Sequence, residues 1–333
     1  MVEYGLLFVG LGLILASAEL FTNGIEWLGK RLNLSEGAVG SILAAVGTAL
    51  PETLVPVIAI LFGTGEATTE IGIGAILGAP FMLGTLAMFV TGLAALLFYR
   101  RRRTIRIRSD YHLMSRDLGF FLSCYSLAIL AGFSGERWIK QGVAGCLVLG
   151  YMLYVYLTLQ GGQATGESEL NPLVFARRSH FPRFRIILTQ VVVALIGIVV
   201  GAEFFVEAIN QLAIDFAISP LILSMIITPI ATELPEKFNS VIWMRKSKDT
   251  LALGNITGAM VFQSSIIPAI GIALTPWTFT LGSPHVFNAG LALISAGLLW
   301  LLLKIRKRIN ALHLLGCGVF YLTFIWLVFN RIV

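Results

Sequence analysis

Long apolar runs recur along almost the whole chain, and they constrain its fold more than any other feature. A helix needs about 20 predominantly apolar residues to cross roughly 30 Å of hydrocarbon. Ten segments meet this requirement, which predicts an all-α polytopic membrane protein with ten transmembrane helices. The predicted spans are residues 3–28, 36–62, 69–99, 117–134, 138–160, 186–211, 219–243, 250–274, 286–304 and 310–331.

Composition agrees with this interpretation. Of the 333 residues, 57% are hydrophobic and only 13% are charged, and the mean hydropathy is +0.86. Soluble domains carry about 25% charged residues, so this chain has too few to be solvated by water alone. Several spans exceed the length of a perpendicular crossing, which predicts tilted or broken helices. The first span starts at Val2 without a basic leader, which predicts a retained helix and not a cleaved signal peptide.

The basic residues are concentrated in every second connection, and therefore on one side of the predicted membrane. Connections after the first, third, fifth, seventh and ninth spans hold 20 of the 24 Lys and Arg residues. By the positive-inside rule these connections are cytoplasmic, so both termini are predicted to lie outside. The same distribution accounts for the net charge of +6 without a nucleic-acid partner.

The two halves of the chain repeat one another at an offset of 184 residues. Ala18-Glu19 recurs as Ala202-Glu203, and Leu50-Pro51-Glu52 recurs as Leu234-Pro235-Glu236. Each half has five spans, an odd number, so the second half must enter the membrane from the opposite side. Inverted repeats with a binding site near the membrane midplane are typical of secondary transporters. We therefore expect two inverted five-helix repeats, residues 1–160 and 186–333, joined by a cytoplasmic linker over 161–185.

Two related motifs place oxygen atoms in the middle of the second and seventh spans. They read Gly47-Thr48-Ala49-Leu50-Pro51-Glu52 and Ala231-Thr232-Glu233-Leu234-Pro235-Glu236. Each proline frees backbone carbonyls, and each final Glu lies four residues after a Thr, on the same helical face. Hydroxyl, carbonyl and carboxylate oxygens suit Ca2+, Na+ or Mg2+. Ionisable residues cost roughly 3 kcal/mol at the membrane centre and usually mark an ion pathway.

Glu233 has two interpretations at this point. It can act as a further ligand, or it can pair within its helix with Lys237, which lies four residues later.

The G-T-x-x-P-E and A-T-E-L-P-E motifs, with the A-E-x-F strings and L-A-L-G-N-I-T-G, resemble the two alpha-repeats of the cation/Ca2+ exchanger superfamily. The resemblance is nearest to its Na+/Ca2+ exchanger branch and covers residues 35–85 and 219–265. It implies that Glu52 and Glu236 bind Ca2+ and Na+. It further implies hydroxyl ligands from Thr48 and Thr232, carbonyl ligands from Ala45 and Pro229, and a side-chain ligand position at Gln263.

The chain departs from the family pattern in the third and eighth spans. Ala79, Leu83 and Ala259 stand where the family commonly has oxygen-bearing ligands. These departures predict fewer Na+ per Ca2+ than in fully liganded members.

The resemblance implies a secondary antiporter of a prokaryotic inner membrane, which exchanges Ca2+ for Na+ by alternating access. A H+-coupled exchanger of Ca2+ or another divalent cation is the alternative, and a non-transporting cation sensor is a third reading. No Ser-His or Asp-pair arrangement indicates an enzyme. The expected partners are metal cations and the lipid bilayer, and the transported ions are substrates, so no cofactor is expected.

Overall fold

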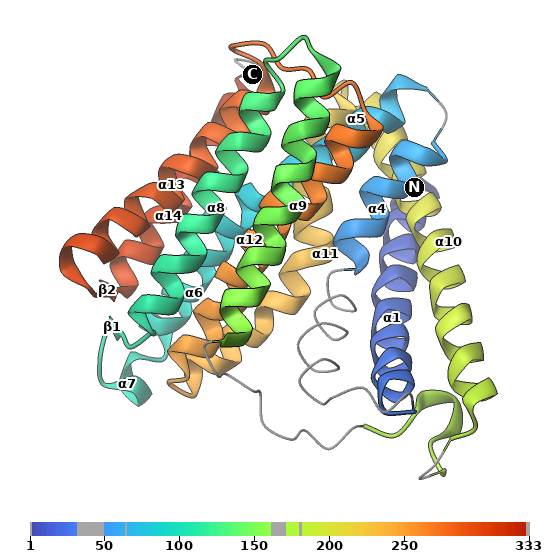
Figure 1. Ribbon diagram of the computed structural model, residues 1–333, viewed down its shortest axis with the longest axis horizontal. Coiled ribbons are helices and arrows are strands. Elements are labelled where there is room, and N and C mark those ends of the chain that lie inside the picture. The colour runs from blue at the N-terminus through green and yellow to red at the C-terminus, as the bar shows by residue number, and fades with distance from the viewer. Residues whose placement is uncertain (1, 32–49, 64, 161–170, 180–181, 331–333) are drawn as a thin grey trace. The chain divides into compact units, whose positions relative to one another are not determined.

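The computed structural model describes residues 2–31, 50–63, 65–160, 171–179 and 182–330, and these are almost entirely helical. Helices lie in every predicted span (Figure 1). They are α1 (Val2–Arg31), α4 (Leu50–Leu61), α5 (Glu66–Met82), α6 (Met88–Leu97), α8 (Tyr111–Ala131), α9 (Arg137–Gln160), α10 (Phe184–Phe216), α11 (Pro220–Arg245), α12 (Asp249–Leu274), α13 (Pro284–Arg306) and α14 (Ala311–Phe329).

Shorter elements connect these helices. The π-helix η2 (Leu83–Ala87) joins α5 to α6 in one continuous span, and α7 (Tyr99–Arg102) and the 3-10 turn η3 (Val174–Ala176) lie in connections. The strands β1 (Arg106–Ile107) and β2 (Ile309–Asn310) have two residues each. Among the described residues, eight helical segments are long and apolar enough to cross a membrane, and Pro51–Leu61 and Pro220–Glu233 are shorter apolar helices.

Helix α8 begins at Tyr111, earlier than the predicted start at residue 117. The cause is a capping residue, because the Asp110 carboxylate accepts hydrogen bonds from the backbone N–H groups of His112 (2.8 Å) and Leu113 (3.2 Å). Arg116, predicted to lie in the basic connection, is therefore inside the helix.

Helix α11 is continuous through Pro229 and Pro235, so the expectation of a broken helix is wrong here. Each proline removes one backbone donor, and the residues around it keep helical geometry. The carbonyls of Met225 and Ala231 consequently have no N–H donor four residues later.

The described residues form two compact units, each drawing segments from both predicted repeats. The first comprises residues 1–71 and 155–218 and contains α1, α4 and α10. Helices α1 and α10 lie side by side and antiparallel, because Gly10 contacts Gly201 near one end and Gly24 contacts Val191 near the other (Figure 1). A Cβ at Gly10 would lie 2.8 Å from the Gly201 carbonyl oxygen, so the two backbones approach closely.

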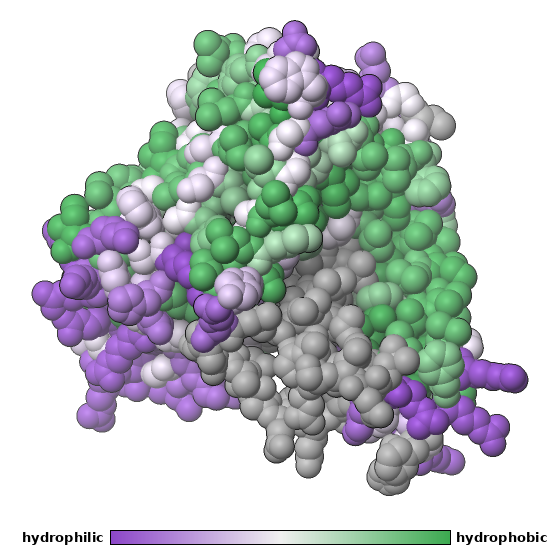
Figure 2. Space-filling model, in the orientation of Figure 1, coloured by the Kyte–Doolittle hydropathy of each residue, from purple (hydrophilic) through white to green (hydrophobic). Residues whose placement is uncertain are grey.

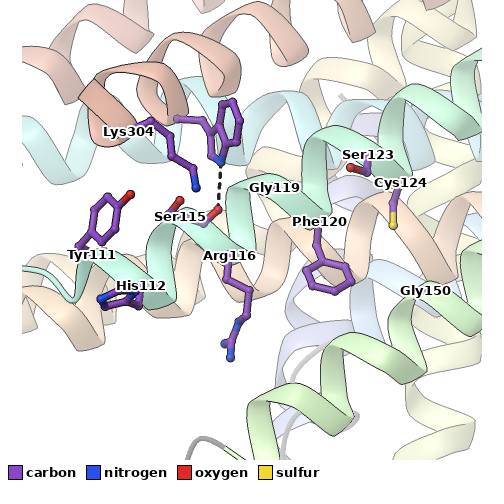
Figure 3. Close-up of a pocket in the computed structure, with 11 residues that line it drawn as sticks. Tyr111, His112, Ser115, Arg116, Gly119, Phe120, Ser123, Cys124, Gly150 and Lys304 are labelled. Atoms are coloured by element: carbon purple, nitrogen blue, oxygen red, sulfur yellow. Dashed lines mark hydrogen bonds between the residues drawn. The ribbon is translucent and has the colours of Figure 1, made fainter. Parts of the chain in front are cut away.

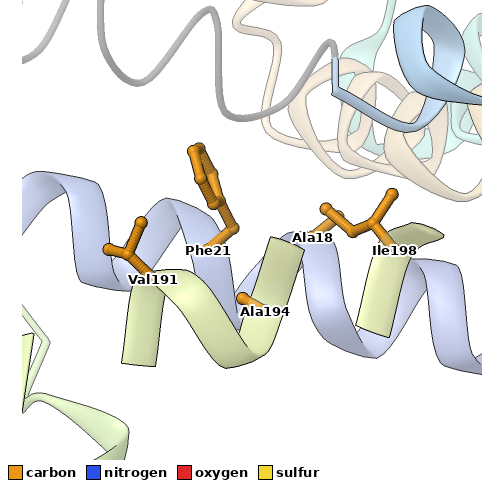
Figure 4. Close-up of a cluster of buried hydrophobic side chains, with 5 residues drawn as sticks. All are labelled: Ala18, Phe21, Val191, Ala194 and Ile198. Carbon is orange, nitrogen blue, oxygen red and sulfur yellow. The ribbon is translucent and has the colours of Figure 1, made fainter. Parts of the chain in front are cut away.

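Apolar side chains fill the α1–α10 interface between these glycines. The cluster in Figure 4 consists of Ala18, Phe21, Val191, Ala194 and Ile198. Lipid tails are as apolar as these side chains, so within a bilayer the interface is stabilised by van der Waals packing. Small residues on both helices also allow the close packing that associates helices within lipid.

The described end of the predicted linker packs against the C-terminal end of α1. The side-chain amide of Gln190 donates to the Leu20 carbonyl (2.9 Å) and to Asn23 Oδ1 (3.0 Å), and it accepts from the backbone N–H of Phe175 (2.9 Å). Gln190 is fully buried, and these bonds use both ends of its amide. The fully hydrogen-bonded amide fixes α10, α1 and η3 together at this end.

The second unit comprises residues 72–154 and 219–333. In it α12 packs against α8 and α11, α6 packs against α14 and α11, and α13 packs against α8 and α14. Helix α5 crosses α11 closely, because a Cβ at Gly74 or Gly78 would collide with the carbonyl oxygens of Leu221 and Met225.

The basic connections of the second unit lie together at one end, as the charge pattern predicts. Arg102 donates to both oxygens of Asp249, at 2.6 and 2.8 Å, and strand β1 pairs with β2. These contacts join the connections after the third, seventh and ninth predicted spans. Figure 2 shows hydrophilic residues concentrated at this end, where α7, β1 and β2 lie, and hydrophobic residues along the helices.

The opposite end of this unit joins two other connections. The Phe279 N–H donates to the Gly132 carbonyl (2.8 Å), and Lys140 Nζ donates to the Pro276 carbonyl (2.6 Å). The connections after the fourth and eighth predicted spans therefore lie together. Within this unit, odd-numbered and even-numbered connections are separated to opposite ends.

Candidate cation-binding site

The predicted ligands fall into three groups. Ala45 and Thr48, with residues 35–49 of the first motif, lie outside the described residues. Glu52 lies in the first turn of α4, in the first unit, and is buried at 6% exposure. The remaining predicted ligands belong to α11 and α12 in the second unit, namely Pro229, Thr232, Glu233, Glu236 and Gln263.

Glu233 forms the centre of a buried polar cluster in the second unit. Its Oε2 atom lies 3.4 Å from Lys237 Nζ, and its Oε1 atom accepts a 2.8 Å hydrogen bond from Gln263 Nε2. Glu233 is 1% exposed, Gln263 is 2% exposed and Lys237 is 4% exposed. The structure therefore forms the ion pair that the sequence left open and adds Gln263 of α12 as a second partner.

Gln263 has an oxygen atom that the cluster does not use. With Nε2 directed at Glu233, its Oε1 atom has no hydrogen-bond partner among the described residues, although it is buried. A buried polar atom without a partner costs about 1–3 kcal/mol, so such atoms are uncommon. An amide oxygen is also a hard ligand of the kind that Ca2+ and Na+ prefer. Gln263 therefore has the chemistry of a cation ligand.

A row of hydroxyl groups leads along α11 to this cluster. The Oγ atoms of Ser224 and Thr228 lie 3.1 Å apart, and Thr232 Oγ1 donates to the Thr228 carbonyl at 3.0 Å. All three residues are buried. The sequence analysis missed Ser224 and Thr228, but their spacing of four residues, which continues through Thr232 to Glu236, was available as a signal. This spacing places hydroxyl oxygens along one buried face of α11.

A further buried carboxylate belongs to the packing of α8 on α12. Asp117 Oδ2 accepts a 2.7 Å hydrogen bond from Thr257 Oγ1, and its Oδ1 atom lies 3.2 Å from an Arg116 nitrogen. This carboxylate has a hydroxyl partner and a cationic partner within the protein. We therefore assign Asp117 to helix packing and not to the cation site.

Within the described part of the chain, no three His, Cys, Asp or Glu side chains come close enough together to hold a metal ion. Beside the Glu233 carboxylate, the described side chains offer the hydroxyl oxygens of α11 and the amide oxygen of Gln263. Such neutral oxygens are hard ligands suited to Ca2+ or Na+.

A cavity of about 590 Å³ lies elsewhere, between α8, α9 and α13 (Figure 3). Arg116, Phe120 and Lys304 contribute to its walls, and Trp300 Nε1 donates to the Ser115 carbonyl at 3.1 Å. None of the predicted ligands lines this cavity, so it is separate from the candidate cation site.

Comparison with known protein families identifies the family of this chain. The family described as sodium/calcium exchanger protein matches residues 2–160 and 186–332 of this chain. The chain belongs to this family. The predicted resemblance is therefore confirmed, and the chain is an integral membrane protein of an exchanger family.

Two relatives are identical to this chain at about a quarter of the aligned residues. The putative antiporter CaxA of Alkalimonas amylolytica is 25% identical over 324 residues, covering 93% of this chain and 92% of its own length. The uncharacterized membrane protein MJ0091 of Methanocaldococcus jannaschii is 26% identical over 274 residues and covers 80% of each chain.

Two solved structures show the same fold. The H+/Ca2+ exchanger CAX has a TM-score of 0.73 at 15% identity and covers 98% of this chain and 82% of its own. The sodium-calcium exchanger NCX_Mj has a TM-score of 0.57 at 24% identity and covers 97% of this chain and 98% of its own. The two exchangers differ in their coupling ion, so the shared fold is compatible with either ion.

Proposed function

We propose that this chain is a secondary antiporter that exchanges Ca2+ for Na+ across a membrane by alternating access. The observation that carries the proposal is the buried oxygen-rich face of α11 beside Gln263, whose Oε1 atom has no hydrogen-bond partner among the described residues. Cation ligands inside a transmembrane bundle mark an ion pathway. Family membership and the similarity to the putative antiporter CaxA and the exchanger NCX_Mj support exchange as the activity.

The proposed architecture has ten transmembrane helices arranged as two inverted repeats, residues 1–160 and 186–333, joined by the linker. A pseudo-two-fold axis in the membrane plane makes equivalent helices antiparallel. The antiparallel packing of α1 and α10, which are equivalent at the offset of 184 residues, supports this arrangement. The matched family segments also support it, because they end at residue 160 and resume at residue 186.

The proposed ligands come from both repeats. The carboxylates of Glu52 and Glu236 provide the charge that a divalent cation requires, and neutral oxygens complete the site. The neutral ligands are the hydroxyls of Thr48 and Thr232, the carbonyls of Ala45 and Pro229, and the amide oxygen of Gln263.

The proposed orientation has both termini outside and the odd-numbered connections in the cytoplasm of a prokaryotic cell. The gathering of three basic connections at one end of the second unit supports it, because these connections need to lie on one side of the membrane.

A H+-coupled exchanger is the second candidate. It is favoured by the apolar residues at family ligand positions, because Ala79 and Leu83 are buried in the described structure and carry no side-chain oxygen for Na+. A carboxylate cluster can bind protons where Na+ ligands are missing. A sensor that binds a cation without transporting it is the third candidate.

Ca2+ uptake into proteoliposomes under separately imposed Na+ and H+ gradients tests these candidates. We expect uptake driven by an outward Na+ gradient and little uptake without a gradient. Uptake driven by a H+ gradient and indifferent to Na+ would transfer the assignment to the second candidate. Ca2+ binding without flux under either gradient would indicate the sensor.

A further inference from the structure

The cavity between α8, α9 and α13 has no part in the proposed function, and its two ends differ in chemistry (Figure 3). At one end lie His112, in the first turn of α8, and Lys304, in the last turn of α13. At the other end lie Phe120 and Cys124 of α8 and Gly150 of α9. A cavity with a basic end and an apolar end suits an amphipathic ligand that carries a negative charge.

Two cationic side chains line the cavity, and aromatic rings hold both of them in place. Lys304 Nζ lies 5.4 Å from the centre of the Trp300 ring, and Arg116 Cζ lies 5.3 Å from the centre of the Tyr154 ring. Arg116 also contacts the Asp117 carboxylate through two nitrogens, which leaves part of its five-donor guanidinium for another acceptor. No Asp or Glu is among the described residues that line the cavity. An anionic group is therefore the electrostatic complement of its basic end.

The cavity is long enough and wide enough for a chain molecule. Helices α8 and α9 meet here through large side chains, since the ring centres of Phe120 and Tyr154 lie 5.4 Å apart. The lining residues of α8 extend from Tyr111 to Cys124, which is about 20 Å along a helix and exceeds half of a hydrocarbon core of roughly 30 Å. Its volume of about 590 Å³ is in the range of pockets that hold whole organic ligands. Lys304 and Ser123 are exposed, so the cavity is accessible at both ends.

We propose that this cavity binds an anionic phospholipid, whose phosphate contacts Arg116 and Lys304 and whose acyl chain lies along Phe120 and Gly150. Basic pockets between transmembrane helices bind anionic lipid headgroups. The site lies wholly within the second unit and requires only that the chain resides in a bilayer, so it holds whichever ion drives transport. The lipid contacts α8, α9 and α13 together, so its binding stabilises the folded bundle.

Native mass spectrometry of the full-length, delipidated protein in detergent tests this site. The probes are phosphatidylglycerol and phosphatidylcholine with identical acyl chains. We expect wild type to bind its first phosphatidylglycerol at least about tenfold more tightly than its first phosphatidylcholine, because two cationic side chains face the anionic headgroup. Lys304→Gln should weaken phosphatidylglycerol binding about fivefold and leave phosphatidylcholine binding unchanged. Lys307→Gln is the matched control, because Lys307 is exposed beside the end of α13 and does not line the cavity.

A second pair of variants tests the place of the acyl chain. Gly150→Leu puts a side chain into the cavity and should weaken the binding of both lipids. Gly142→Leu on the same helix is its control, because a Cβ there meets nothing within 4 Å and Gly142 does not line the cavity. Phosphatidylglycerol should raise the thermal unfolding temperature of wild type and Gly142→Leu, but not that of Gly150→Leu.

Equal binding of the two lipids by wild type, or wild-type affinity for phosphatidylglycerol in Lys304→Gln, overturns the proposal. Lys304 is exposed, so this variant should fold, and its result decides even if Gly150→Leu does not fold. Inorganic phosphate carries the anionic group without an acyl chain and should not displace the bound lipid. Displacement by phosphate would assign the cavity to soluble phosphate compounds and would also overturn the proposal.

Discussion

Single residues in this chain place oxygen atoms at buried positions of otherwise apolar helices. Glu52 is buried in α4, and the hydroxyls of Ser224, Thr228 and Thr232 follow the buried face of α11. A buried carboxylate contributes strongly to Ca2+ affinity, because the affinity of a Ca2+ site follows the charge of its ligands. We therefore expect the loss of a single carboxylate to lower the Ca2+ affinity strongly.

Replacing either equivalent carboxylate by its neutral amide should weaken Ca2+ binding. We expect Glu52→Gln and Glu236→Gln each to lower the apparent Ca2+ affinity at least about tenfold, which corresponds to roughly 1.4 kcal/mol. Ca2+ uptake measured against Ca2+ concentration provides the affinity. Glu19→Gln, at an exposed position of α1, is the matched control and should retain wild-type affinity. Near-normal affinity in both Glu52→Gln and Glu236→Gln would remove these residues from the site.

At the scale of secondary-structure elements, close packing between helices positions the site. Helix α5 lies against α11 at Gly74 and Gly78, where no Cβ fits beside the Leu221 and Met225 carbonyls. The Met225 carbonyl is also one that loses its helical N–H donor, because Pro229 stands four residues later. The π-helix η2 interrupts the regular helical pattern farther along the same span, and α13 supports it through a 2.8 Å hydrogen bond from Ser295 to the Gly84 carbonyl.

Adding one methyl group at this crossing should separate the two helices. We expect Gly78→Ala to destabilise the protein by about 1–3 kcal/mol, the usual cost of an overpacked core. Thermal unfolding in detergent measures the effect. Gly142→Ala on α9 is the control, because a Cβ there meets nothing within 4 Å and alanine favours a helix more than glycine does. Equal unfolding temperatures for Gly78→Ala and wild type would contradict the close contact.

At the scale of the whole molecule, the alternation of basic connections with connections poor in Lys and Arg is the basis of the proposed orientation in the membrane. In the second unit, the buried Arg102–Asp249 ion pair and the β1–β2 pairing join basic connections at one end. The bond from Lys140 to Pro276 lies at the other end. An excess of Lys and Arg in short connections places them in the cytoplasm.

Accessibility of single cysteines tests this orientation. We expect cysteines at the exposed positions Arg101 and Arg306 to react with a membrane-impermeant maleimide in inside-out vesicles but not in intact cells. A cysteine at exposed Glu136, in the opposite set of connections, should show the reverse pattern. Serine replaces Cys146, the exposed native cysteine, in each variant. Labelling of Arg101→Cys or Arg306→Cys from outside would reverse the proposed topology.

Several features of the molecule followed from local sequence because they depend on local physics. Apolar runs predict helices in lipid, since every backbone N–H and carbonyl must be hydrogen-bonded within the bilayer. The structure accordingly has a helix in each predicted span. The family followed from the paired motifs around Glu52 and Glu236. The limits of helices were less predictable, because the start of α8 depends on the cap at Asp110 and not on hydropathy.

Tertiary structure decided which of the possible side-chain pairs form. Lys237 lies on the same helix as Glu233, so their pairing was one of two outcomes that the sequence allowed. Gln263 lies 30 residues beyond Glu233, and its hydrogen bond depends on how α11 and α12 pack. The same holds for the pairing of Arg102 with Asp249. Helical periodicity specifies neighbours three or four residues apart, whereas partners on different helices are selected by packing over the whole bundle.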